Sequence, residues 1–458
     1  MDGNGLGVRL MAAVRAGDAD AVRALLDAGA DPDTEVDGLS ALCVALAAYD
    51  EAVTEALVRA GADPDRVLPD GTTLLWRAVD GGSPAVFVDL LGSDARERLP
   101  EAARERLLAL ARGWYETGAA EELRRRTGAR GPAVMARVQE DAYHWVEEIS
   151  LGGRVVRAGH GAVLTWLEWA FRVLTPVDEL VARAVRQRDE DHVDWTTARW
   201  ILVQRRSDET WSAVVAHRHH PDPWYRRFVT DYVRMRSLVD PGHRYYRKRE
   251  GELLAAWAAE ETDVDMLAEV LTALAEYEHP GQEAVGLRHA GHPDPRVRRE
   301  VPCLLSDDDG DPRSPTAKDA MLALMSDPDA EVRLYASSAA MDGDELRAQA
   351  TDALLLLTRS PVVPARHGAA VKLAASRDRT PAVADALFAL LDEDEQLVRL
   401  EAAWGLARRD DPRTEEAYER VGPLGPGFEH DHRAHALGEW RQRRSEEAAG
   451  CGPPPVRR

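Results

Sequence analysis

The hexapeptide Ala28-Gly29-Ala30-Asp31-Pro32-Asp33 returns unchanged, 32 residues later, as Ala60-Gly61-Ala62-Asp63-Pro64-Asp65. A glycine at this place ends a helix in the left-handed conformation, and the proline that follows prevents its continuation. Apolar positions keep the same period at offsets of 32 and 33, among them Leu10, Leu42, Leu75, Leu25, Leu57 and Leu90. We therefore predict three units of two short helices and a hairpin-like loop, which stack because one unit cannot bury its own apolar face.

This pattern resembles the ankyrin repeat over residues 6–92. The usual Thr-Pro-Leu-His turn reads Ser40-Ala41-Leu42-Cys43 and Thr73-Leu74-Leu75-Trp76, without the histidine, so we expect looser hairpins. The resemblance implies a protein-binding module whose contacts come from the hairpin tips and the first helix of each repeat. The tip residues that it implies are Glu35, Asp37, Arg66 and Leu68. The alternative is that they are ordinary solvated loop residues.

A second period runs through the C-terminal part. Its core pieces begin at Val297, Val332, Ala365 and Val398, at separations of 35, 33 and 33 residues, and each continues with apolar residues on one helical face. Acidic residues or prolines precede three of them, which suits the start of a helix. The segment from His220 parallels the one from His292 at an offset of 72, so we expect a degenerate unit between them, near 261–276.

These C-terminal units resemble HEAT repeats, including the variety found in phycobilin lyases, over residues 210–422. The resemblance implies a structural ladder in which arginines pair with acidic residues of neighbouring repeats. The arginines concerned are Arg298, Arg333, Arg366 and Arg399. The order of ankyrin then HEAT repeats resembles that of actinobacterial ankyrin/HEAT-repeat proteins.

The segment between the two sets of repeats is predicted to be a helical connector. Residues 150–159 form either a short hairpin around Gly152-Gly153 or a helical loop. Several tryptophans follow at high density: Trp166, Trp169, Trp195, Trp200 and Trp211. Such residues can form an aromatic cage or a platform for bases, but large rings between stacked helices more often anchor the core, which is the interpretation we favour.

Residues 224–249 combine aromatic and basic side chains. From residue 226 onward this stretch holds eight basic residues and two acidic ones. The candidate contacts to a partner are Trp224, Tyr225, Arg226, Arg227, Tyr245, Tyr246 and Arg247. Cations and rings in this arrangement suit a nucleic-acid groove, but arginine and tyrosine also anchor protein interfaces. The net charge of the chain, −22, favours a protein partner and leaves nucleic acid as the alternative.

Two histidine clusters, at 217–220 and 430–435, raise the question of a metal. His220 belongs to a repeat start, and no fourth ligand is evident near His432 and His435, so we predict no metal site. The GxxxxGK[ST], GxGxxG, GxSxG and HExxH motifs do not occur, nor does a His-Glu dipeptide of the kind that holds iron in HEAT-repeat hydroxylases. We therefore predict no cofactor and no catalytic activity.

Composition agrees with a soluble repeat protein. The 458 residues are 45% hydrophobic and 30% charged, and three distant cysteines offer no disulfide framework, which favours a reducing cytoplasm and no membrane contact. We predict an all-α fold of tandem helical-repeat solenoids, a short ankyrin stack followed by a HEAT-like α-solenoid. The predicted domains are 1–95 (ankyrin), 96–209 (connector), 210–440 (HEAT-like) and 441–458 (disordered tail). Their predicted role is a scaffold or adaptor for unidentified protein partners.

Overall fold

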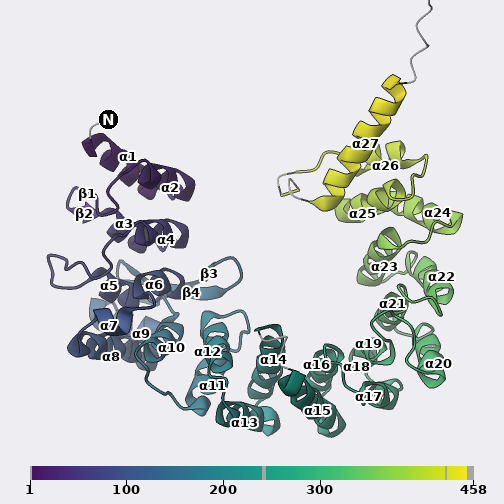
Figure 1. Cartoon of the computed structure of the whole chain (residues 1–458), viewed down its shortest axis with the longest axis horizontal. Coiled ribbons are helices and arrows are strands. Elements are labelled where there is room, and N and C mark those ends of the chain that lie inside the picture. The colour runs from purple at the N-terminus through teal and green to yellow at the C-terminus, as the bar shows by residue number, and fades with distance from the viewer. Residues whose placement is uncertain (1–2, 240–243, 426, 429–430, 451–458) are drawn as a thin grey trace, which may run out of the picture. The chain divides into compact units, whose positions relative to one another are not determined.

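The computed structural model describes residues 3–239, 244–425, 427–428 and 431–450. Within these residues it contains 27 α-helices and two small antiparallel sheets, and 65% of the chain is helical (Figure 1). The predicted all-α helical-repeat class is confirmed. The chain forms two compact units, residues 1–240 and 241–458. The domain boundaries predicted at 95, 209 and 440 stay predictions.

The N-terminal unit holds the predicted ankyrin repeats and the connector. Its elements are α1 (Gly3–Ala16), α2 (Ala19–Asp27), β1 (Glu35–Val36), β2 (Leu39–Ser40), α3 (Ala41–Ala48), α4 (Glu51–Arg59), α5 (Leu74–Gly81), α6 (Pro84–Leu91), α7 (Ala95–Arg98), α8 (Glu101–Thr117), α9 (Ala119–Thr127), β3 (Val134–Gln139), β4 (Trp145–Leu151), β5 (Arg154–Arg157), α10 (His160–Ala170), α11 (Val177–Val185), α12 (Val193–Gln204), α13 (Asp208–Ala216), a 3-10 turn (His217–His219) and α14 (Pro223–Val239).

Three helix pairs, α1/α2, α3/α4 and α5/α6, stack on one another as the repeat predicted (Figure 1). Gly29 and Gly61 adopt φ values of 89° and 98°, so the left-handed turn after each second helix is confirmed. The repeated turns are tied together because Asp33 Oδ1 accepts a hydrogen bond of 3.2 Å from the backbone N–H of Asp63. Although the family histidine is missing, Ser40 Oγ still accepts from the N–H of Cys43 at 3.2 Å and caps α3.

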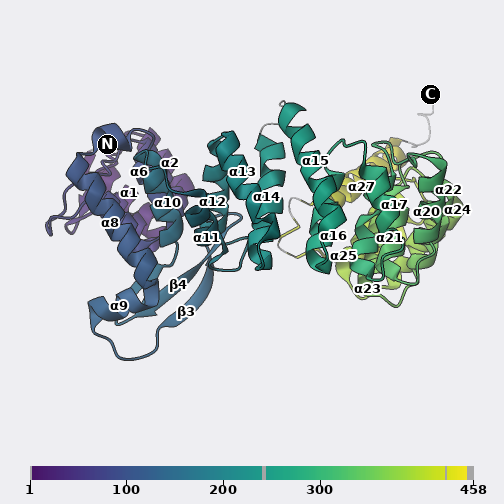
Figure 2. The same cartoon turned by 90° about the horizontal axis from the view of Figure 1, so that it is seen from below.

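The ankyrin core does not end with the third pair. Helices α8 and α10 pack against each other and against α5 and α6 as a fourth pair. One continuous apolar cluster therefore joins the ankyrin leucines to residues of both helices, such as Leu107 and Leu164. Between α8 and α10 the chain inserts α9 and the three strands β3 to β5, which lie to one side of that pair (Figure 2). We call residues 119–157 the insertion.

The connector, predicted to be helical with either a hairpin or a helical loop at 150–159, contains the three-stranded sheet of the insertion. Strand β4 pairs antiparallel with both β3 and β5, and Gly152-Gly153 forms the turn between β4 and β5, so the hairpin alternative for residues 150–159 is confirmed. Strand β3 was not predicted. Its side chains from Val134 to Arg137 are all exposed, so it carries no apolar alternation that sequence reasoning detects.

The C-terminal unit is built from helix pairs at the predicted places. Its elements are α15 (Arg244–Glu260), α16 (Val264–Ala275), α17 (Gln282–His289), α18 (Pro295–Glu300), α19 (Pro302–Leu305), α20 (Pro315–Leu324), α21 (Ala330–Ala339), α22 (Arg347–Leu357), α23 (Val363–Ala375), α24 (Pro381–Ala389), a 3-10 turn (Leu390–Asp392), α25 (Gln396–Ala407), α26 (Thr414–Val421) and α27 (His432–Gly450). A single apolar cluster runs from Val301 to Trp440 through the unit.

A recurring arginine braces the start of each C-terminal repeat. Arg298 Nη1 donates to the carbonyl of His292, six residues earlier, at 2.8 Å, and Arg333, Arg366 and Arg399 make the same bond at 2.6–2.7 Å. Two of the four also reach the next repeat, because Arg298 pairs with Asp327 at 2.8 Å and Arg366 with Glu393 at 2.9 Å. The predicted ladder is therefore mixed: each of the four arginines binds a backbone carbonyl, and Arg298 and Arg366 also form ion pairs with the next repeat.

Helix α27 extends to Gly450, so residues 441–450, predicted as the beginning of a disordered tail, are helical. Residues 451–458, the rest of that prediction, lie outside the described residues. No helix in the described part of the chain is long and apolar enough to cross a membrane.

Candidate functional site

The predicted tip residues of the ankyrin hairpins all contact other parts of the repeats. Glu35 and Arg66 form an ion pair of 2.6 Å between neighbouring hairpins, and Asp37 lies 3.5 Å from Arg15. Leu68 is half-buried and packs against the ankyrin core. The exposed apolar side chains at this edge are instead Leu39 and Val67, whose residues are 47% and 69% exposed. That any of these residues contacts a partner stays a prediction.

The first part of the predicted basic aromatic segment packs within the N-terminal unit. Trp224 contacts the buried ring of Trp195 edge-on, with centroids 6.1 Å apart. The ring of Tyr225 stacks on His220 at 3.9 Å. Arg226 Nη1 donates to the carbonyl of His220 at 3.2 Å, which repeats the Arg298–His292 brace at the predicted offset of 72.

The remaining residues of that segment divide between the two units. Arg227 lies 3.4 Å from Glu190 in the N-terminal unit. Tyr246 and Arg247 belong to α15 in the C-terminal unit, where Arg247 Nη2 donates to the carbonyl of Glu276 at 3.1 Å. Residues 240–243 and the side chain of Tyr245 lie outside the described residues. The described cations therefore make intramolecular bonds, and their role toward a partner is untested.

The histidine clusters show no grouping of metal ligands among the residues that the structure describes. His217 Nε2 lies 3.1 Å from Asp178, and His432 packs edge-on against Trp404. His430 lies outside the described residues.

The insertion creates a pocket that the sequence did not predict. Two buried carboxylates hold the insertion against the third ankyrin repeat. Asp80, at the end of α5, accepts from Trp114 Nε1 at 2.9 Å and pairs with Arg126 and with Arg154, the latter at 3.2 Å. Glu140, after β3, accepts from the N–H of Ala85 at 3.0 Å and pairs with Arg157 at 2.6 Å. Its carboxylate also bonds the Ser83 hydroxyl.

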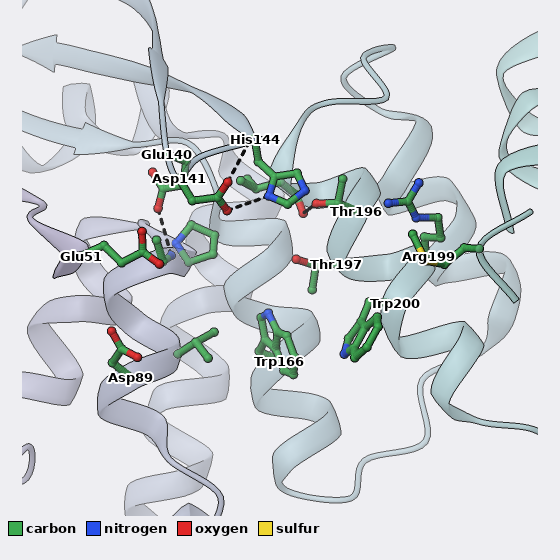
Figure 3. Close-up of a pocket in the computed structure, with 15 residues that line it drawn as sticks. Glu51, Asp89, Glu140, Asp141, His144, Trp166, Thr196, Thr197, Arg199 and Trp200 are labelled. Carbon is green, nitrogen blue, oxygen red and sulfur yellow. Dashed lines mark hydrogen bonds and ion pairs between the residues drawn. The ribbon is translucent and has the colours of Figure 1, made fainter. Parts of the chain in front are cut away.

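The cavity between the insertion and the helices, which we call the insertion pocket, has a volume of about 420 Å³. It is lined by Glu51, Pro84, Ala85, Val88, Asp89, Glu140, Asp141, His144, Trp166, Val193, Thr196, Thr197, Arg199, Trp200 and Met235. Helices α4 and α6 supply Glu51 and Asp89, whereas α10 and α12 supply Trp166 and Trp200. Figure 3 shows the two indole rings at one end of the pocket and the Asp141–His144 pair at the other.

Most charged groups of the insertion pocket are already compensated. His144 Nδ1 lies 2.6 Å from Asp141 Oδ2, and this bond, with those from the N–H groups of Tyr143 and His144, overcomes burial and lowers the pKa of Asp141. Arg199 donates to Asp231 at 2.6 Å. These bonds engage Asp141 and Arg199 within the protein.

Asp89 differs from its neighbours. Burial, with repulsion from Glu55 and Glu51, raises the pKa of Asp89 to about 6, although Arg59 opposes the shift. Asp89 Oδ2 is buried and accepts no hydrogen bond from any residue in the described part of the chain. Burial and the carboxylates of Asp141 and Glu140 likewise raise the pKa of the exposed Glu51. This side of the pocket is therefore acidic, because Arg59 pairs with Glu55 at 2.7 Å and only partly offsets the carboxylates of Asp89 and Glu51.

Sequence reasoning noticed the tryptophans but assigned them to the core. That interpretation holds for Trp195 and Trp211, whose residues are 0% and 8% exposed. It is wrong for Trp200, which is 40% exposed and lines the insertion pocket with Trp166. One feature of the sequence could have indicated the acidic side of the pocket: Asp89 is a charged residue within the apolar run from Val86 to Leu91.

Comparison with known proteins identifies the N-terminal repeats. Residues 10–98 match the family model "Ankyrin repeats (3 copies)". No significant match was found among curated protein sequences. Among solved structures, the X-ray structure of the YibA protein of Escherichia coli is similar, with 14% identity and a TM-score of 0.40 over 59% of this chain and 93% of that chain. Residues 10–98 thus hold ankyrin repeats, a repeat that is typical of protein-interaction modules.

Proposed function

We propose that the protein is a non-enzymatic cytoplasmic scaffold that binds protein partners through its ankyrin repeats and through C-terminal repeats of HEAT type. The observation that carries the proposal is the ankyrin match over residues 10–98, because this repeat is a protein-interaction module. The regular helix pairs and arginine braces of the C-terminal unit support the HEAT-like assignment. Stacked repeats of this kind present extended surfaces for partners.

The exposed apolar tips mark the surface at which we expect the first partner. Leu39 and Val67 stand beside the Glu35–Arg66 ion pair on neighbouring hairpins. Apolar side chains that become buried on association contribute most of the binding energy, whereas a satisfied rim ion pair contributes little. The proposed contact is therefore apolar at its centre and charged at its rim.

The test is affinity capture with the full chain from nuclease-treated cytosol, followed by mass spectrometry. The full chain is required because the ankyrin core continues into α8 and α10, so a fragment ending at residue 95 exposes that core. We expect a stoichiometric protein that the double variant Leu39→Glu/Val67→Glu loses. The control is Leu174→Glu, which changes an exposed apolar residue of the N-terminal unit outside the ankyrin repeats.

Capture that is equal for both variants contradicts the tips as the contact. Recovery of nucleic acid alone, seen only when nuclease is omitted, contradicts the scaffold and supports the alternative in which residues 224–249 bind nucleic acid.

A further inference from the structure

The insertion pocket has the composition of a site for a small positively charged group. Its indole rings, Trp166 and Trp200, come from α10 and α12, whereas the carboxylates of Asp89 and Glu51 come from α6 and α4 on the other side of the pocket (Figure 3). Thr197 of α12 adds a hydroxyl between them. A cation over an indole face is attracted by the ring quadrupole, and tryptophan is the best of the aromatic residues for this purpose. Rings and carboxylates together thus favour a cation over an anion or a neutral group.

The carboxylates decide which kind of cation fits. A quaternary ammonium ion has no N–H to donate and makes full use of rings only, whereas a primary ammonium or a guanidinium group donates several hydrogen bonds. The Asp89 carboxylate lines the pocket and its buried Oδ2 takes no hydrogen bond from a described residue, so the carboxylate is not tied to a protein donor through that atom. Charge-assisted bonds from N–H groups to carboxylates are among the stronger hydrogen bonds. No group of three metal-ligating side chains occurs among the described residues, so the pocket does not have the ligands of a metal site.

We propose that the insertion pocket binds an organic cation with N–H donors, a primary ammonium or a guanidinium group, between the indole rings and the Asp89 carboxylate. The volume of about 420 Å³ falls within the range of small-molecule pockets and leaves room for the stem that carries the cation. The inference goes beyond the scaffold function, since it assigns a ligand chemistry to the pocket itself. The cation belongs either to a free small molecule or to a lysine or arginine side chain of a peptide.

An exposed tyrosine beside the insertion pocket favours a peptide side chain as the source of the cation. The side chain of Tyr143 belongs to a residue that is 80% exposed, in the loop between β3 and β4 beside Asp141 and His144, which line the pocket. An exposed tyrosine next to a pocket is a typical anchor for a flanking peptide segment.

Binding is measured by isothermal titration of the full chain with butylguanidinium, butylammonium and tetramethylammonium. The peptide arm compares acetyl-Gly-Arg-Gly-amide with its neutral citrulline analogue. We expect binding at one site per chain for the donors of N–H groups, and binding about tenfold weaker or absent for tetramethylammonium and citrulline. A peptide that binds more tightly than butylguanidinium identifies a partner side chain as the source, whereas equal affinities identify a free small molecule.

Variants locate the site. Asp89→Asn keeps the shape of the side chain and removes its charge, so we expect a loss of about tenfold. Trp200→Ala removes an exposed ring and is expected to weaken binding severalfold, and Trp200→Phe restores part of it. The matched control is Asp27→Asn, which makes the same charge change at an exposed position of α2 outside the pocket.

The pH dependence of the affinity tests the role of Asp89 independently of the variants. Protonation of Asp89 competes with the cation, so affinity is expected to fall as the pH drops through about 6. The charged groups that surround Asp89 are Glu51, Glu55 and Arg59 on α4, and Glu140, Asp141, His144 and Arg199 at the other walls.

No heat of binding for any cation at millimolar concentration, with a normal unfolding transition, overturns the proposal. Binding that survives both Asp89→Asn and Trp200→Ala overturns the site. Either result leaves the capture experiment on the ankyrin tips unaffected, so the two proposals fail separately.

Discussion

In the C-terminal unit, neighbouring helix pairs are braced by arginines that recur with the repeat, whereas in the N-terminal unit one insertion is held by two buried carboxylates. Arg298 and its counterparts bind carbonyls six residues earlier and remain partly solvated. Asp80 and Glu140 instead each gather several donors, and their side chains are only 8% and 1% exposed. A periodic brace spreads the stabilisation over many weak contacts, whereas a buried carboxylate concentrates it in one residue.

The largest loss of stability is expected at Asp80, because this one carboxylate gathers several donors. Asp80→Asn removes the charge that Arg126 and Arg154 share, and Glu122 remains as the carboxylate paired with Arg126, whose side chain is 20% exposed. Removing one partner of a buried ion pair costs about 3–5 kcal/mol of unfolding free energy, and we expect the lower end of this range because Arg126 keeps Glu122. Urea unfolding measures the loss, and hydrogen exchange is expected to place it in residues 119–157. The control is Asp70→Asn, an exposed partner of Arg77, which is expected to leave the transition unchanged.

The second prediction concerns acid. His160 stacks on Trp114 beside Asp80, with ring centroids 4.6 Å apart, and burial lowers its pKa to about 4. An unfolded histidine titrates near 6.5, so the unfolded chain takes up a proton that the native chain refuses until about pH 4. The N-terminal unit is therefore expected to lose about 3 kcal/mol between pH 6.5 and pH 4.

This loss is measured as the urea midpoint against pH. His160→Gln removes the titrating group and is expected to flatten the profile, whereas His435→Gln, at a side chain that is 77% exposed, leaves it unchanged. A profile with the same slope in the wild type and in His160→Gln contradicts the assignment.

The third prediction tests the distributed brace. Arg298→Ala removes the ion pair with Asp327 and the bond to the carbonyl of His292. Because the side chain is 12% exposed and water replaces part of these bonds, we expect a loss of about 1–2 kcal/mol in the C-terminal unit. The neighbouring Arg296, 49% exposed, provides the control, since Arg296→Ala is expected to have no measurable effect. A loss as large as that of Asp80→Asn removes the distinction between the two units.

The contrast between periodic braces and a single insertion also explains which parts of the structure could be predicted from the sequence. The repeats and their arginines are visible because they recur. The offset of 72 relates the segments from His220 and His292, but Arg226 was predicted as a partner contact and instead forms the same brace as Arg298. The insertion occurs once and has no period. Strand β3 has an exposed face with no apolar alternation, and the pocket joins Asp89, Asp141 and Trp200, which are distant in sequence. Such a site follows only from the packing of α10 and α12 beside the ankyrin stack.

The smallest effect is expected at the ankyrin tips, where the predicted contact residues Glu35 and Arg66 form an ion pair with side chains 48% and 32% exposed. Exposed pairs gain little because water screens their attraction, so Glu35→Gln is expected to cost about 0.5 kcal/mol or less. Even this loss should vanish in 1 M salt, where the screening length falls to about 3 Å. Thermal unfolding at low and high salt checks it. A larger loss that persists in salt means that the tips, like the insertion, are held by a structural pair, and then the free apolar edge at Leu39 and Val67 is the only part of the hairpins left to serve a partner.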